Sequence, residues 1–98
     1  MTDFDYQKID DVIHSRIRTA IMAVLISYEE VEFRYLKEKT NATDGNLSIH
    51  LKKLEDAGYL TVKKKFVMRK PVSKYKITNK GRKAFENYIK KLESIVKK

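Results

Sequence analysis

The chain has 98 residues, 42% of them hydrophobic, with three Gly and one Pro. This length and composition fit a single domain over residues 1–98 with one core. The 22 Lys and Arg residues outnumber the 13 Asp and Glu residues, and the net charge of +9 favours a polyanionic partner. The excess lies in the second half: residues 1–49 carry six basic and nine acidic groups (net −3), and residues 50–98 carry sixteen and four (net +12).

The composition excludes several classes of protein. The sequence has no cysteine, so disulfide scaffolds, thiolate metal sites and thiol redox switches are impossible. Its longest apolar run, residues 20–26, is seven residues long, well short of the roughly 20 that span a bilayer. No basic and apolar leader marks the N-terminus. We therefore expect a cytoplasmic protein with no membrane partner.

The first half of the sequence predicts helices separated by a short strand. Apolar residues recur at helical spacing from Ile9 to Tyr28, which predicts one helix with a broad buried face. The alternation over 31–33 predicts a short strand, and a brief helix follows from Arg34 to about Thr40. Asn41 lies where a turn needs a residue that tolerates left-handed φ.

Turn-forming residues then precede the next predicted helix. Thr43 is a plausible N-cap, and Gly58 ends the segment as a glycine able to adopt positive φ. The leucines of this helix fall on one face, at positions i, i+4 and i+7. His50 lies at the inner edge of that face, so we expect it to be a half-buried hydrogen-bonding group.

The second half predicts a basic hairpin and a last helix. Alternation over 60–66 and 74–77 predicts two paired strands, with Leu60, Val62, Phe66, Tyr75 and Ile77 inward and four lysines sharing the outward face. Like charges opposed across strands are destabilising, and a polyanion would relieve that repulsion. Thr78 can cap the last helix. Between residues 59 and 83 there is no acidic residue and there are ten basic ones: Lys63, Lys64, Lys65, Arg69, Lys70, Lys74, Lys76, Lys80, Arg82 and Lys83.

This order of elements predicts an α+β fold, mainly helical: a winged helix-turn-helix with a β-hairpin wing. The helix-turn-helix is expected over about 33–58, the wing over about 59–78, and a C-terminal dimerisation helix over about 79–97.

The stretch TDGNLSIHLKKLEDAGYL (43–60), followed by KYKITNKGRKAFENY (74–88), resembles winged helix-turn-helix transcriptional regulators, nearest to small regulators related to the MarR and ArsR families. The resemblance covers about residues 13–88. It implies that the helix over 43–57 enters the major groove, that the hairpin tip touches an adjacent groove or the backbone, and that the terminal helices build a homodimer.

The face of this helix opposite the leucines would meet DNA. Asn46 can pair with adenine, Ser48 can bond a base or a phosphate, and the lysines can reach guanine or the backbone. An exposed Ile49 could cover a thymine methyl, or it could pack on the wing or be an ordinary exposed aliphatic. One arginine or lysine at the hairpin tip could enter a minor groove. The predicted DNA-binding residues are Thr43, Gly45, Asn46, Ser48, Ile49, Lys52, Lys53, Lys63, Lys65, Arg69, Lys70 and Lys74.

The apolar surplus of the two terminal helices predicts a symmetric dimer that would read inverted half-sites. The alternative is that the two helices satisfy each other within one chain. The predicted interface residues are Ile9, Ile13, Ile17, Phe85, Tyr88, Ile89, Leu92, Ile95 and Val96.

These features predict sequence-specific binding of double-stranded DNA by a homodimeric transcription regulator, with repression as the expected effect. The alternative is a winged-helix module that binds acidic protein partners through its basic face. An enzyme is disfavoured, because the sequence has no nucleophile–base motif and no glycine-rich phosphate loop. No cofactor or metal is expected, unless carboxylates complete a site with the two histidines between subunits. A small-molecule effector could bind between the dimer helices, but no residue indicates its chemistry.

Overall fold

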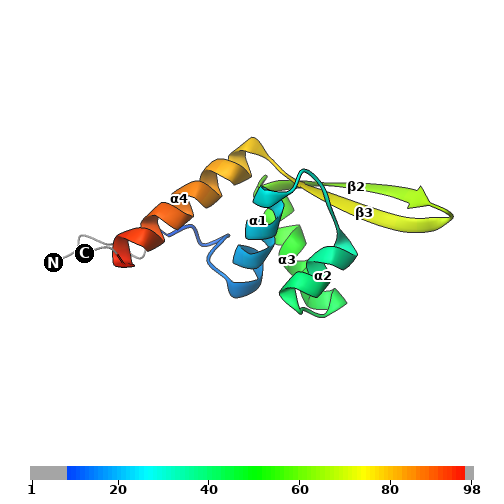
Figure 1. The fold of residues 1–98 in the computed structure, drawn as a ribbon, viewed down its shortest axis with the longest axis horizontal. Helices are drawn as coiled ribbons and strands as arrows, with labels where there is room; N and C mark the ends of the chain where they lie inside the picture. The colour runs from blue at the N-terminus through cyan, green and yellow to red at the C-terminus, as the bar shows by residue number, and fades with distance from the viewer. Residues whose placement is uncertain (1–8, 97–98) are drawn as a thin grey trace.

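The structure, a computed structural model, describes residues 9–96, with side chains as far as residue 94. It confirms the predicted α+β winged helix (Figure 1). Its elements are α1 (Arg16–Ser27), β1 (Val31–Glu32), α2 (Phe33–Thr40), α3 (Asp44–Asp56), β2 (Leu60–Val67), β3 (Lys70–Ile77) and α4 (Asn79–Val96).

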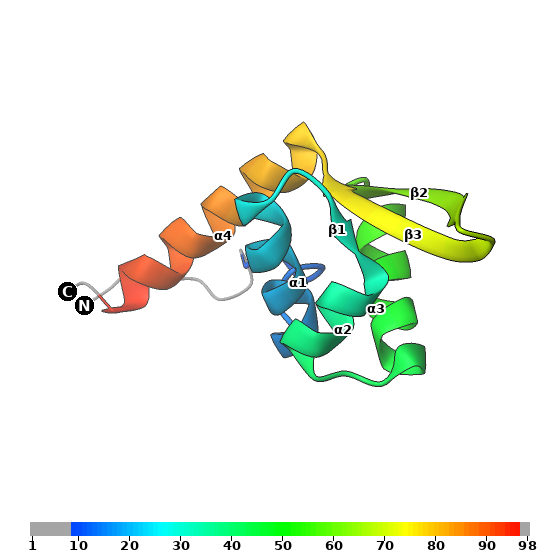
Figure 2. The same cartoon turned by 45° about the vertical axis from the view of Figure 1, so that its right-hand side comes forward.

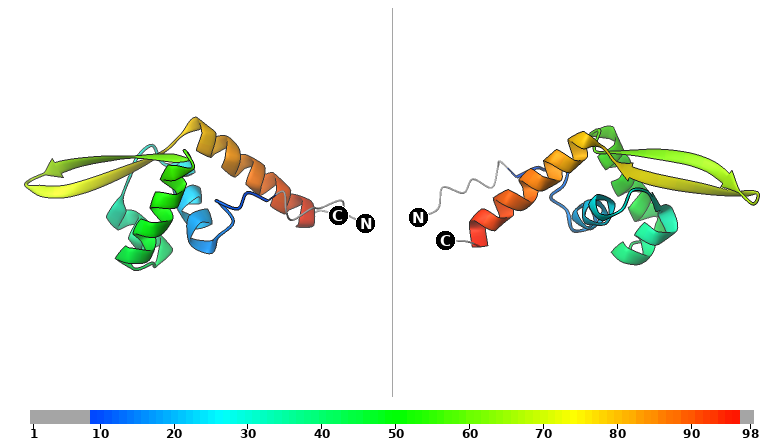
Figure 3. Two further views of the ribbon diagram at one scale, coloured as in Figure 1. Left: turned by 180° about the vertical axis from the view of Figure 1, so that it is seen from behind. Right: turned by 45° about the horizontal axis from the view of Figure 1, so that its top comes forward.

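The first three helices form a compact body around one core, and a three-stranded antiparallel sheet of order β1-β3-β2 lies against it (Figure 2). The hairpin of β2 and β3 and the C-terminal half of α4 project from this body in opposite directions (Figures 1 and 3). Each helix contributes to the core through one apolar stripe. The core side chains that are less than 2% exposed are Ile13, Ile21, Met22, Leu25, Leu36, Leu47, Leu54 and Leu60.

The turns around α3 confirm the local predictions. Asn41 ends α2 in the left-handed region, with φ 55°, and donates its backbone N–H to the Lys37 carbonyl. Thr43 caps α3, because its side chain accepts from the Asn46 N–H at 3.1 Å. At the other end Gly58 has φ 81°, and the Gly58 and Tyr59 N–H groups bond the carbonyls of residues 55 and 54. This pair of bonds is a Schellman motif, which closes the helix and directs the chain into β2.

The predicted helix from Ile9 is wrong over its first turns, since α1 begins only at Arg16. The Asp10 carboxylate accepts from the backbone N–H groups of Val12, at 2.9 Å, and Ile13, at 3.2 Å, and so holds a turn. Ser15 then caps α1 by accepting from the N–H of residue 18. Short polar side chains that bond nearby backbone compete with a helix. Ile9 and Ile13 are nevertheless buried. Their spacing of four residues matches the helical period, so the pattern predicted a helix where the structure has a turn.

The hairpin pairs in the register Leu60 with Ile77 and Val62 with Tyr75, which puts these side chains on one face of the sheet. Leu60, Tyr75 and Ile77 are buried, as predicted. Phe66 is not, because 77% of it is exposed. The alternation was interpreted correctly, but Phe66 lies near the end of the hairpin, opposite Pro71, and the outer part of the hairpin runs past the edge of the helical body (Figure 2).

Thr78 confirms its predicted role as the cap of α4. Its hydroxyl accepts from the Gly81 N–H at 2.9 Å and donates to the Gly58 carbonyl at 2.6 Å, so one side chain joins the end of α3 to the start of α4. Gly81 lies against the backbone of Tyr59, whose carbonyl accepts from the Thr78 N–H at 3.0 Å. The last helix therefore starts in direct contact with the start of the wing.

A polar bridge joins α1 to α3. Arg18 Nη1 lies 2.8 Å from Nδ1 of His50, which is half-buried as predicted, and Arg18 Nε donates to the Val12 carbonyl. Arginine has donors only, so His50 must accept through Nδ1 and is therefore neutral. Burial lowers the pKa of His50, and the positive charges of Arg18 and Lys53 lower it further.

Gly81→Ala should destabilise the domain. A Cβ at this position would lie 2.1 Å from the Tyr59 carbonyl oxygen, so the start of α4 must move away. We expect a loss of about 1–3 kcal/mol, with the melting temperature falling by roughly 4–8 °C for each kcal/mol. Gly45→Ala is the matched control: nothing lies within 4 Å of its added Cβ, and it should stabilise the helix by about 0.5–1 kcal/mol. Equal melting temperatures for the two variants would contradict this packing.

The stability of the domain should depend on the protonation of His50. Its pKa in the folded chain is below the ordinary 6.5, so on acidification the unfolded chain takes up the proton first. Its contribution is complete above about pH 6.5 and is lost as the pH falls through the folded pKa. Thermal melts should compare the wild type with His50→Gln, which keeps an acceptor for Arg18. As the pH falls below about 6.5, the melting temperature of the wild type should fall more than that of the variant, which has no group that titrates at this position. Parallel pH profiles would show that His50 does not couple to folding.

Candidate nucleic-acid interface

One face of α3 is open to solvent, and it carries the predicted recognition side chains. Leu47, Leu51 and Leu54 are buried at 3% exposure or less, so the helical period turns the opposite face outward. Ile49 is 57% exposed, so this aliphatic side chain lies on the open face as predicted. The other predicted residues of this helix and its cap are all exposed: Thr43, Gly45, Asn46, Ser48, Lys52 and Lys53.

Two lysines on or near this face make ion pairs with exposed acidic residues. Lys52 Nζ lies 3.1 Å from the Asp56 carboxylate, one turn further along, and this contact raises the pKa of Lys52. Lys37 pairs with Asp44 at 2.7 Å and so neutralises a carboxylate in the first turn of α3. Exposed pairs of this kind are screened by solvent, so Lys52 can exchange its partner for a phosphate.

A groove of about 660 Å³ lies between α3 and the hairpin. Ser48 and Lys52 line it from α3, and Lys64 lines it from β2. Lys64 was missed as a site residue in the predicted set. Its position was recoverable, because alternation from Leu60 puts residue 64 on the same face as the inward residues, the face that looks toward α3. The groove thus brings together hydroxyl and ammonium donors from two elements, and the Glu55 carboxylate of α3 also lines it.

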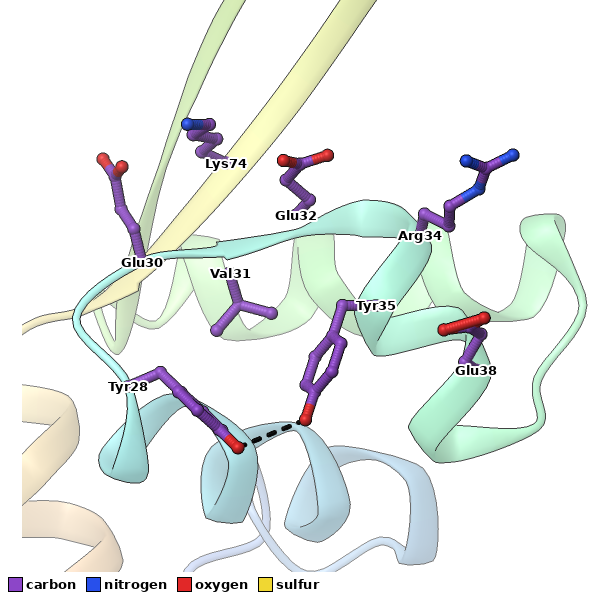
Figure 4. Close-up of a pocket in the computed structure, with 8 residues that line it drawn as sticks. All are labelled: Tyr28, Glu30, Val31, Glu32, Arg34, Tyr35, Glu38 and Lys74. Atoms are coloured by element: carbon purple, nitrogen blue, oxygen red, sulfur yellow. Dashed lines mark hydrogen bonds between the residues drawn. The ribbon is translucent and has the colours of Figure 1, made fainter.

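The other hairpin lysines lie on the opposite face. Lys63 is paired directly with Lys74, which confirms the predicted opposition of like charges. Lys74 is also paired with Glu32 of β1. Figure 4 shows Lys74 on the same side of β1 as Glu30 and Glu32, with Val31 on the other side, and all four residues line a pocket of about 540 Å³. The predicted contacts of Lys63, Lys65 and Lys74 with DNA remain a prediction, and Lys64 is the hairpin lysine that the groove itself contains.

Arg69 and Lys70 lie at the apex of the hairpin, and both are exposed. The loop between the strands has two residues, Met68 and Arg69, both with positive φ (51° and 68°). Positive φ at both positions is typical of the tight type I′ hairpin turn. None of the hairpin cations makes an ion pair within the described part of the chain, so their charge is available to an anion.

The predicted dimer residues divide into three groups, of which the first is buried. Ile9, Ile13, Phe85 and Tyr88 are buried within the single chain, at 8% exposure or less, so for these four the alternative of packing within one chain describes the structure. Tyr88 Oη, for example, lies 3.0 Å from His14 Nδ1.

Three other predicted interface residues have side chains that are exposed or partly exposed to solvent. Ile89 is 37% exposed, and Ile17 and Leu92 are half-buried. The side chains of Ile95 and Val96 lie outside the described residues. The interface with a partner stays a prediction.

The chemistry of this surface is hydrogen bonding and charge. Within the described residues, no three His, Asp or Glu side chains are grouped as a metal ion would require. None of the described helices is long and apolar enough to cross a membrane. This surface combines the exposed face of α3, the groove beside it and the basic hairpin. Its shape and charge are complementary to a polyanion with ridges and grooves.

Several solved structures share this fold. A transcriptional regulator homologue from Pyrococcus horikoshii OT3 matches with a TM-score of 0.79 at 22% identity, over 87% of this chain and 84% of that one. A MarR-family transcriptional regulator from Silicibacter pomeroyi matches with a TM-score of 0.71 at 16% identity, over 91% of this chain and 59% of that one. At these identities the likeness shows the fold.

The sequence itself is similar to a nearer relative and to one family. An uncharacterized protein of Methanocaldococcus jannaschii is 51% identical over 78 residues, which cover 80% of this chain and 85% of the relative. The family described as "Winged helix DNA-binding domain" matches residues 17–96, from the second residue of α1 to the end of α4. The chain belongs to this family of winged helix DNA-binding domains.

Proposed function

We propose that this domain binds double-stranded DNA sequence-specifically, as a homodimeric transcription regulator. The observation that carries the proposal is the groove between α3 and the hairpin, whose lining includes Ser48, Lys52 and Lys64 together with one carboxylate, that of Glu55. With α3 in a major groove, Asn46 and Ser48 would reach base edges, and the lysines on either side of the groove would hold the phosphate backbone.

Two kinds of contact are needed for such a function, and the surface offers both. Phosphate contacts supply affinity and register, and base-edge contacts supply specificity. Ile49 adds an apolar contact suited to a thymine methyl. A domain that covers a duplex blocks other proteins from it, so we propose repression as the effect. No enzymatic step is proposed.

Affinity for duplex DNA should fall steeply with salt, because each neutralised phosphate contributes about −0.9 to the slope of log K against log salt. Lys64→Ala should weaken binding and reduce that slope by about one such contact. Lys90→Ala is the matched control, since it removes the same charge from an exposed lysine of α4 that does not line the groove. Fluorescence anisotropy with a labelled duplex across a salt series measures both.

Selection of bound sequences from a random duplex library supplies the operator for this test and shows whether binding is specific. A flat salt dependence, or selection that recovers no sequence, would reject the DNA-binding proposal and leave the acidic-protein partner as the explanation of the basic face. Equal effects of the two lysine variants would reject the assignment of the groove, but not DNA binding itself.

Dimerisation is supported by the shape of α4. This helix has 18 residues, a length of about 27 Å, and its C-terminal half leaves the helical body (Figure 3). Ile89 remains exposed there, and Leu92 is covered only in part. Two copies that pack these halves together would present two α3 helices for inverted half-sites.

Light scattering at micromolar concentration should give a mass of twice 11.6 kDa. Ile89→Glu should shift this mass toward the monomer, because it would place a carboxylate in an apolar contact. Lys90→Glu makes a carboxylate at the adjacent exposed position and should leave the dimer intact. A monomeric wild-type chain would overturn the dimer proposal.

A further inference from the structure

The apex of the hairpin exposes large apolar side chains. Phe66 is 77% exposed, Met68 is 91% exposed and Val67 is 44% exposed. Phe66 and Met68 are the most exposed of the large hydrophobic residues described, ahead of Ile49 at 57%. Water-exposed apolar groups gathered at one projecting point are unfavourable unless a partner covers them, and such patches mark contact sites.

These side chains are carried on a well-defined support. The strands stay paired as far as Val67 and Lys70, and only Met68 and Arg69 form the loop. Positive φ at both loop residues is usually left to Asn or Gly, and strained backbone of this kind is typical of functional positions. Phe66 lies opposite Pro71, a residue with a restricted backbone. The apolar groups are therefore presented at the end of a rigid arm.

The charges around the apex select the partner. No acidic residue lies between Asp56 and Glu86, and Arg69 and Lys70 directly follow the exposed Met68. A partner that attracts these cations and also covers apolar side chains must have an anionic exterior and an apolar interior. Duplex DNA has both, since its stacked bases lie behind the phosphates, and proteins enter it from the minor groove with Phe or Met wedges.

The alternation of side chains along β2 also decides which way the apolar side chain of Phe66 faces. Phe66 is two residues beyond Lys64, so both lie on the face of β2 that looks toward α3. Lys64 lines the groove that α3 shares. A duplex seated on α3 would therefore run past Lys64 toward Phe66, and α3 and the apex would meet the same duplex.

From this arrangement we infer that the hairpin apex is a wedge: Phe66 and Met68 enter the minor groove beside the site bound by α3, partly unstack one base step and kink the duplex. Arg69 and Lys70 hold the phosphates on either side. This inference rests on the proposed function. It adds a second source of specificity, because pyrimidine–purine steps unstack more easily than others and would be favoured without a base hydrogen bond.

The test is a bending measurement on a duplex of about 30 base pairs with the selected sequence at its centre and a donor and an acceptor dye at its ends. Saturating wild-type protein should raise energy transfer, corresponding to a bend of roughly 20–90°. Phe66→Ser/Met68→Ser should still bind this duplex through α3 and lose that rise. Both side chains are exposed, so circular dichroism should show an unchanged fold.

Val67→Ser is the matched control, because it removes an apolar side chain from the same apex on the opposite face of the strand. It should bend the duplex as the wild type does. Equal bending by the double variant, or binding by the wild type without any bend, would overturn the wedge while leaving the proposed function in place. Failure of the wild type to bind duplex DNA would overturn both. Binding of the wild type, but not of the double variant, to vesicles of anionic lipid in preference to DNA would assign the apex to a membrane surface instead.

Discussion

The leucine stripe of α3 is the constraint on which the rest of the structure depends. Leu47, Leu51 and Leu54 are buried against α1 and the sheet, and this fixes the rotation of the helix about its own axis. The polar face must then point outward. The Schellman turn at Gly58 sets the direction in which the chain leaves α3, so the register of the wing is fixed by the same burial.

Local chemistry made much of this predictable. The turn at Asn41, the cap at Thr43 and the positive φ at Gly58 each depend on residues within one turn of chain, and each was predicted and observed. Periodicity gave the buried face of α3 for the same reason. Residues 9–15 were mispredicted because a side chain, that of Asp10, bonds the backbone and replaces a helix without altering the spacing of the buried isoleucines.

The burial of side chains in the hairpin was harder to predict, because it depends on how far each residue lies from the core. Alternation tells which face of a strand a side chain takes, but it does not tell how far the core extends beneath the strand. Phe66 was therefore predicted inward although the hairpin has already left the body. Lys64 was missed because a lysine contributes nothing to a hydrophobic pattern, although the alternation from Leu60 already puts it on the face that looks toward α3, where it lines the groove.

Charge and stability oppose each other in the wing. Lys63 and Lys74 are paired side by side, which costs stability in the free domain, and Glu32 on the other side of Lys74 offsets only part of that cost. Buried residues at the base, Leu60, Tyr75 and Ile77, hold the strands together where the charges repel. Because the base is anchored in the core, the outer hairpin can carry unpaired cations and exposed apolar groups that would not be stable on an isolated hairpin. The features that a duplex would contact are therefore those that the fold itself does not need.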